Sequence, residues 1–379
     1  MHSLTIREFA KGRRPIKTPS LAVIGLVATA TAAAGTATDA LNAAFPIGEL
    51  TLVTNIDAAI SKAGTGGTLA KALAAIADLT TPIVIVSRVA PGAGAEADEE
   101  TDENVIAGLD LLLSAKGAVG YAPRIIGAPG LDTLAVTTQM VIVAKRLRGF
   151  AYARANGDDG VEAMNYRDGF TARELMLIWP NSSTETAGDA VARALGLRAQ
   201  IDERIGWHKT ISNMPIDGVT ALDHYVQFDL LDPSTEAGTL NGKQITTIIR
   251  ANGFRFWGNR TTAGPDQPEF AFESAVRTSH ALQDIIADVF QPYFDHPMTV
   301  SLIKDLLETA NAKFRELALN GFIMGAKAYF DADRNQPEQL SAGRPDFRIE
   351  FTPVAPLEDP TVELVITDFY YSGFADRLV

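Results

Sequence analysis

Short apolar runs alternate with helical patterns between residues 20 and 205. Near-continuous apolar runs are typical of strands buried on both faces of a sheet. They predict strands at Ser20–Ala28, Leu50–Val53, Pro82–Val89, Arg124–Gly127, Gly149–Ala153 and Glu174–Trp179. Apolar residues at helical spacing predict helices at Leu69–Ala77, Val105–Lys116, Thr133–Arg148 and Ala187–Arg204. The alternation predicts an α/β layer around a mostly buried sheet.

The pattern changes after about residue 240. Ile245–Arg250 and Gly253–Asn259 read as two strands around a turn at Ala251-Asn252-Gly253. Two amphipathic helices follow, and their apolar residues are Leu282, Ile285, Ile286, Val289, Phe290 and Tyr293, then Ile303, Leu306, Leu307, Ala310, Phe314 and Leu317. Phe347–Phe351 alternates like a half-buried strand. We therefore predict an α/β domain over residues 20–260 and a smaller α+β domain over residues 261–362.

Both chain ends carry strand-like segments. Leu4–Phe9 opens the chain and Val362–Tyr371 closes it. Segments at chain ends are normally poorly ordered unless something pairs with them. We therefore predict extended arms over residues 1–19 and 363–379 that add strands to other copies of the chain. The apolar residues expected to make that link are Leu4, Ile6, Phe9, Leu364, Ile366 and Phe369.

Composition excludes several classes of protein. With 46% hydrophobic and 21% charged residues, the chain has the make-up of a folded globular protein. A net charge of −13 disfavours nucleic acid or an anionic membrane as a partner. No run is long and apolar enough for a membrane anchor, and the absence of cysteine excludes disulfides and thiolate metal sites. Residues 1–20 are basic, however, so this tail is either solvated or docked on an acidic surface, such as another copy.

No catalytic, cofactor or metal motif holds together. The five histidines are widely spread, and Gly64–Thr68 lacks the lysine of a phosphate-binding loop. The acid-rich stretch Pro91–Asn104 reads as a solvated loop or, less simply, as a calcium site, although it lacks the EF-hand pattern. The alternative to a structural protein is an α/β-fold oxidoreductase or transferase with a ligand at a glycine loop, which rests on fold class alone.

Nine segments, taken in order, resemble the sheath protein of contractile phage tails, in the group of P2-like phages and R-type bacteriocins. The segments are Pro19–Gly25, Tyr121–Leu131, Ala172–Trp179, Ile211–Gly218, Leu240–Lys243, Ala251–Arg260, Arg277–Ile286, Leu317–Phe330 and Val354–Pro360. The likeness runs nearly from end to end, which makes it more specific than any short motif in the chain.

The resemblance implies a structural, non-enzymatic role without cofactors. Stacked hexameric rings of an outer α/β domain and an inner domain would surround a tail tube, joined by strand exchange between arms. Baseplate and tail terminator proteins would be further partners. The particle would be a virion tail or a phage-tail-like particle, assembled in the cytoplasm of the bacterial host, whose contraction drives the tube through a cell envelope. The polar side of the helix near Ser301–Leu317 offers Lys304, Lys313 and Arg315 as tube contacts.

Overall fold

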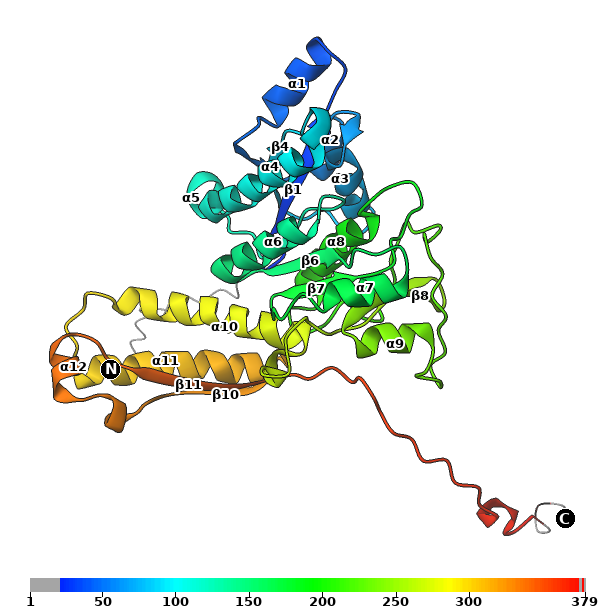
Figure 1. Cartoon of the computed structure of the whole chain (residues 1–379). Helices are drawn as coiled ribbons and strands as arrows, with labels where there is room; N and C mark the ends of the chain where they lie inside the picture. Colours follow the sequence, from blue (N-terminus) through cyan, green and yellow to red (C-terminus); the bar gives the residue numbers. More distant parts are fainter. Residues whose placement is uncertain (1–20, 375–376, 378–379) are drawn as a thin grey trace, which may run out of the picture.

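The computed structural model describes residues 21–374 and residue 377. Its largest feature is a nine-stranded sheet in the order β2-β4-β1-β5-β6-β7-β8-β9, with β3 paired to the end of β1 (Figure 1). The strands are β1 (Ile24–Thr31), β2 (Leu50–Val53), β3 (Gly66–Gly67), β4 (Val84–Val89), β5 (Ile125–Gly127), β6 (Phe150–Arg154), β7 (Leu175–Ile178), β8 (Ile245–Arg250) and β9 (Phe254–Trp257). Strands β4 to β8 along this order run parallel, and β2 and β9 are antiparallel edges. The predicted α/β class is confirmed.

Helices cover both faces of this sheet, which explains why its strands are apolar throughout. Along β1, Ile24 and Leu26 face the cluster that holds α3 and α8, whereas Val23 and Val27 face the cluster that holds α4 and α6. The helices of this body are α1 (Thr36–Ala44), α2 (Ile56–Ile60), α3 (Leu69–Ala77), α4 (Ala97–Leu111), α5 (Ala115–Val119), α6 (Leu134–Leu147), α7 (Gly160–Arg167), α8 (Asp189–Arg204) and α9 (Glu236–Gly242).

A second, elongated body follows the sheet. It consists of α10 (Glu273–Phe290), α11 (Val300–Leu319), β10 (Ile323–Phe330), α12 (Pro337–Ser341) and β11 (Phe347–Pro353). Strands β10 and β11 form an antiparallel pair that packs on the two helices, and Phe314, Leu317 and Ile285 lie in the shared core. Leu21, at the root of the N-terminal arm, is buried in the same core. Figure 1 shows this body extending sideways from the sheet body, with the C-terminal segment leaving in another direction.

Most predicted elements are present, and the hairpin of β8 and β9 turns where the sequence indicates. The acid-rich stretch was predicted wrongly as a loop, because α4 begins at Ala97 and takes up most of its carboxylates. Asp98, Glu99 and Glu100 lie in the first turn of α4, where acidic side chains stabilise the positive end of a helix. Strand β10 was not predicted at all. Its residues Gly325, Ala326 and Ala328 are small and read as neither strand nor helix.

The strand predicted at Val362–Tyr371 is not formed in the single chain, and its pairing with another copy stays a prediction. Residues 354–368 extend from the body without forming a strand, and Phe369–Tyr371 is a single turn of 3₁₀ helix. A lone strand has no partner for its backbone groups. The predicted N-terminal strand, including Leu4, Ile6 and Phe9, lies outside the described residues.

Candidate assembly surfaces

The crevice where α/β proteins usually bind ligands is closed in this chain. That crevice lies beyond the carboxyl ends of the strands where the strand order reverses, here between β1 and β5. The glycine loop Gly64–Thr68 folds back there as β3 and pairs with β1. A Cβ on Gly67 would lie 2.5 Å from the carbonyl oxygen of Thr29, so this glycine allows two backbones to meet. The run GTGGT therefore has a packing reason that requires no phosphate.

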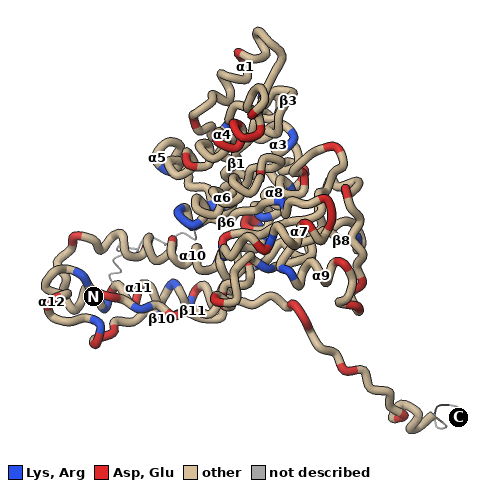
Figure 2. The backbone as a smooth tube through the Cα atoms, in the orientation of Figure 1, with Lys and Arg blue, Asp and Glu red and all other residues tan. Residues whose placement is uncertain are grey.

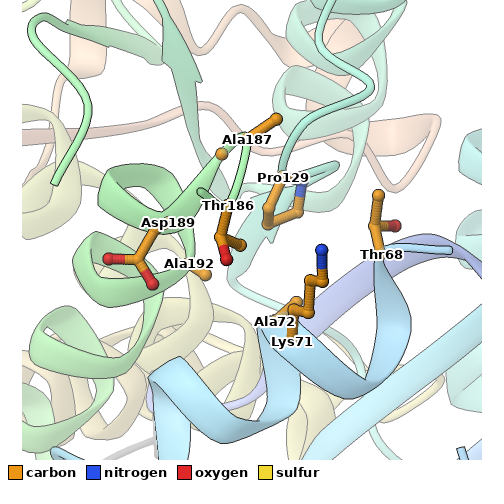
Figure 3. A pocket seen from close by; sticks show the side chains of 9 residues that line it. Thr68, Lys71, Ala72, Pro129, Thr186, Ala187, Asp189 and Ala192 are labelled. Atoms are coloured by element: carbon orange, nitrogen blue, oxygen red, sulfur yellow. The ribbon is translucent and has the colours of Figure 1, made fainter. Parts of the chain in front are cut away.

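The loop that contains Gly130 closes the same crevice from the other side. A Cβ on Gly188 would lie 2.0 Å from the backbone nitrogen of Gly130, so the loops before α6 and α8 touch backbone to backbone. What is left is a hollow with a volume of about 10 Å³, which Lys71 and Thr186 line (Figure 3). Ligand pockets are typically about 300–1,000 Å³. The hollow is thus smaller than the site that an α/β enzyme would need.

The described residues also bear on the metal and membrane predictions. Among residues 21–374, no group of three His, Asp or Glu side chains is arranged to hold a metal ion. His208, His224, His280 and His296 lie apart from one another along that range, and His2 is outside it. No described helix has both the length and the apolar character needed to cross a bilayer.

A buried ionic network joins the two bodies. Glu273, at the start of α10, accepts hydrogen bonds from Tyr152 of β6, from Arg198 of α8 at 3.1 Å and from Thr210 at 3.0 Å. Asp202 of α8 pairs with Arg198 at 2.9 Å and also with Arg277 of α10. The side chains of the four charged residues are 0–2% exposed.

The charges of this network stabilise one another. Burial alone would raise the pKa of Glu273, but Arg198 and Arg277 together hold the pKa of this carboxyl below its usual value. Burial would lower the pKa of Arg198, and Asp202 and Glu273 raise it instead. A charge inside a protein is tolerated only when it is paired and hydrogen-bonded. The network is therefore a buried set of ion pairs that links α8 to α10.

Helix α10 makes further ties on the same face. Asp284 pairs with Arg124 at 2.6 Å and with Arg148 at 2.8 Å. Glu273, Arg277 and Asp284 are four and seven residues apart, so they share one face of the helix. The sequence does carry this signal as a polar stripe opposite the apolar stripe of α10. A polar stripe normally indicates a solvated face, which is why sequence analysis missed that both faces of α10 are buried.

The small sheet of β10 and β11 differs from the large sheet because no described strand covers either of its edges. The described residues pair β10 only with β11, so the outer edge of each strand lacks a backbone partner among residues 21–374. Beyond β11, the ring of Phe347 meets Phe290 of α10 edge-on at 5.1 Å, and Phe290 and Ile286 are only half-buried. Phe290 and Ile286 thus form an apolar strip of α10 beside β11 that the single chain covers only in part.

The C-terminal arm is exposed along its length. The exposed fractions are 93% for Leu364, 97% for Ile366 and 69% for Phe369, so the arm residues predicted from sequence contact nothing large in the isolated chain. The arm is fixed at its root, where Arg260 makes a two-pronged ion pair with Glu358 and stacks on Phe272 at 4.5 Å. Figure 2 shows acidic but no basic residues along the described arm up to residue 374.

The three lysine and arginine residues predicted as tube contacts do not lie together. Lys304 and Arg315 are exposed on α11, and Arg315 pairs with Glu308 at 2.6 Å. Lys313 is buried, with its ammonium 2.7 Å from Glu316. Lys313 thus takes part in the packing of α11, whereas Lys304 and Arg315 can reach a partner.

Comparison with known proteins shows which family has this sequence and fold. The family model of the phage tail sheath protein central domain matches residues 104–262, and that of the phage tail sheath C-terminal domain matches residues 266–367. The tail sheath protein of Escherichia phage P2 is 42% identical over 98% of this chain and 97% of its own length. The major tail sheath protein of Serratia phage KSP20 is 38% identical over 98% of this chain and 96% of its own.

Solved structures share the fold across the whole chain. A chain of the anti-feeding prophage baseplate superposes with a TM-score of 0.71 at 14% identity, covering 96% of this chain and 98% of its own. A chain of the contracted sheath of an extracellular contractile injection system superposes with a TM-score of 0.67 at 12% identity, covering 98% and 99%. With relatives this similar over nearly their full length, the chain belongs to the phage tail sheath protein family and is a structural subunit of the contractile sheath of a phage tail or tail-like particle, not an enzyme.

Proposed function

We propose that copies of this chain stack as hexameric rings around a tail tube and that their arms complete one another's small sheets. The observation that carries the proposal is the two-stranded sheet on a two-helix floor. Two helices side by side span about 20 Å, whereas two strands span about 10 Å. The floor of α10 and α11 therefore has room for about two more strands beside β10 and β11.

The C-terminal arm suits the role of an added strand. Val362, Leu364 and Ile366 alternate along it, so in extended form all three lie on one side and can cover the open apolar strip. Strand addition gives affinity through backbone hydrogen bonds, and no described strand pairs with the outer edges of β10 and β11. On β10 the backbone of Ala328 is already bonded by the Asn311 side chain, so the edge of β11 is the more open of the two. The N-terminal arm, residues 1–19, would add a strand at the remaining edge.

Deletion of residues 364–379 tests the arm. We expect the truncated chain to keep its circular dichroism spectrum and melting temperature, because Leu364 and Ile366 are almost fully exposed in the single chain. We also expect it to form no sheaths in negative-stain images. The matched control changes Glu363 and Thr367 to Gln and Ser, since these side chains point away from Val362, Leu364 and Ile366. Normal sheaths from the truncated chain would reject strand exchange.

We propose a division of labour between the bodies. Residues 20–260 form the outer domain and residues 261–362 the inner, tube-facing domain, whose exposed Lys304 and Arg315 contact the tube. Changing both to Glu should weaken co-assembly with the tube more at low salt than at high salt, because exposed charges are screened. The control reverses Lys243, which lies on the outer body. Co-assembly that is unchanged at low salt would show that the tube binds elsewhere.

The energy for contraction would come from a change in packing between subunits and not from a nucleotide. The proposed source is surface newly buried between copies, worth about 25 cal/mol per Å², summed along the sheath. The extended sheath would be a kinetic trap set during assembly, together with baseplate and terminator proteins, in the cytoplasm of a bacterial host. Contraction would then drive the tube through a cell envelope. Acid, heat or mild denaturant should shorten tails irreversibly without nucleotide, and a requirement for ATP would overturn this account.

A further inference from the structure

The C-terminal arm ends in an aromatic turn, formed by Phe369, Tyr370, Tyr371 and Phe374. The ring centroids of Phe369 and Tyr370 lie 5.5 Å apart, and those of Tyr371 and Phe374 lie 6.0 Å apart. The turn is held by its own hydrogen bonds, because Tyr371 N donates to Asp368 O at 2.9 Å and Ser372 Oγ donates to Phe369 O at 2.6 Å. A preformed cluster of exposed aromatic rings is the kind of surface that anchors protein interfaces.

The far end of the inner body carries an apolar tip, formed by Phe294, Met298 and Val300. These residues lie in and beside the connection from α10 to α11 and are 68%, 38% and 73% exposed. The helix on one side ends in Phe290, whose ring meets Phe347 at the start of β11. The tip therefore continues the apolar strip of α10 beside β11.

We propose that the aromatic turn of one copy docks on the apolar tip of a second copy. The inference rests on the proposed strand exchange. Strand β10 lies on α11, so the partly covered strip of α10 is reached by adding a strand at the edge of β11. An antiparallel addition, the commoner kind, makes the arm run from Pro353 towards Phe347, that is, towards the tip.

The lengths also match. Strand β11 has seven residues, Phe347–Pro353, and the arm has the segment 362–368 before the aromatic turn begins. Aligned antiparallel, Leu364 faces Phe351 and Ile366 faces Ile349, with all four side chains towards the helices. The outward Glu363 then faces Thr352. The aromatic turn begins just beyond Phe347, beside Phe290 and the tip.

The opposite strand direction gives a different outcome. A parallel addition at β11 would carry the aromatic turn to the other end of the small sheet, where Leu319 and Met324 are 88% and 70% exposed. The tube is a second rival, since it could cover the tip itself. Both rivals can be distinguished by crosslinking, because the chain has no cysteine of its own.

The experiment mixes chains that each carry one new cysteine, assembles sheaths on tubes and adds a short bis-maleimide. Ser372→Cys lies beside the aromatic turn, His296→Cys at the tip and Met324→Cys at the opposite end. We expect crosslinked dimers from Ser372→Cys with His296→Cys and none with Met324→Cys. Dimers through Met324→Cys would overturn the proposal, and so would a bond from His296→Cys to a cysteine introduced on the outer surface of the tube protein.

A strand control separates the two proposals. Thr352→Cys with Glu363→Cys should crosslink if the arm adds to β11. If this pair forms and the pair at the tip does not, the aromatic turn docks elsewhere and strand exchange stands; if neither forms, strand exchange at β11 fails and the docking proposal fails with it.

Substitutions supply a second readout without crosslinker. Phe294→Ala and Phe369→Ala should each raise the protein concentration needed for half-maximal sheath formation about tenfold, and the double variant should cost no more than the worse single one, because each already loses the same contact. Leu231→Ala is the control, since Leu231 is 91% exposed on the outer body. Fully additive effects would show that the two rings do not meet.

Discussion

The two sheets of this chain treat their edges in opposite ways. At one edge of the large sheet, residues 213–216 cover β9. Asn213 N donates to Phe256 O at 2.7 Å, and Ile216 N donates to Phe254 O at 2.9 Å. At the other edge, β2 has only four residues. The small sheet has strands of eight and seven residues, and no described strand pairs with either outer edge. Only the side chain of Asn311 on α11 bonds to the backbone of β10, at Ala328.

The difference separates folding from assembly. Short or covered edges prevent unwanted pairing, and a long open edge invites another strand. The large sheet with its two helical layers is complete within the single chain. The small sheet keeps edges without a strand partner, at which, in our proposal, a neighbour adds strands. Substitutions inside the first body should therefore act on the stability of the single chain, and substitutions at the open edge should act on assembly alone.

The largest expected effect on the single chain comes from the buried network. Glu273→Gln removes one of two carboxylates that face Arg198 and Arg277 and leaves a buried positive charge in excess. Breaking one partner of a buried pair typically costs about 3–5 kcal/mol. We expect a loss of this size in the free energy of unfolding, measured with urea on the unassembled chain.

The matched control is an exposed pair in the inner body. Glu308→Gln removes the partner of Arg315, and both side chains are more than half exposed. Exposed pairs contribute roughly 0–1 kcal/mol. Equal losses for Glu273→Gln and Glu308→Gln would contradict the view that the network fastens the two bodies.

The elements of the two bodies show which features of the fold can be predicted from the sequence. The central strands and the helices α3, α6 and α8 of the large body were predictable because each is either apolar throughout or apolar on one stripe. The shorter helices α1, α2, α7 and α9 were not predicted. The conformations of residues 354–368 and of β10 could not be predicted in this way. They depend on pairing partners and on the helices beneath the sheet, which the local sequence pattern does not contain. The stripe of Glu273, Arg277 and Asp284 is visible in sequence, but its partners Arg198 and Arg124 lie far away along the chain.

A smaller and pH-dependent effect is expected at His280. Burial and the nearby Arg277 and Arg173 lower the pKa of this imidazole from 6.5 to about 3. The unfolded chain binds a proton below about pH 6.5 and the folded chain does not, so stability falls as the pH drops from 6.5 towards 3, by at most about 1.4 kcal/mol per pH unit. His280→Asn should flatten this part of the profile, measured by urea unfolding at several pH values.

A counterpart at the surface sharpens the test. His296 is exposed at the α10–α11 connection, so His296→Asn removes a histidine without changing the buried site and serves as the control. An equal flattening by both substitutions would mean that the slope does not come from the buried imidazole.

The smallest expected effect on stability lies at the root of the arm. Arg260 and Glu358 are about one-third exposed, so Glu358→Gln should cost less than about 1 kcal/mol. It should nevertheless broaden the distribution of distances between spin labels at Ser372→Cys and Ser301→Cys in the unassembled chain, because the arm loses its anchor. Glu363→Gln, further along the arm, should leave the distribution as it is; an unchanged distribution for Glu358→Gln would show that the pair does not direct the arm.

The ion pair of Arg260 and Glu358 also determines how far the C-terminal arm can extend from its own subunit. A chain spans at most about 3.5 Å per residue. With Glu358 held, only residues 359–361 separate the anchor from the proposed strand, which gives a tether of about 14 Å. With Glu358 released, the tether starts after Pro353 and lengthens to about 30 Å. Two copies joined by this arm could therefore slide past each other by roughly one tether length before the joint is strained, and a single surface ion pair would decide which of the two lengths applies.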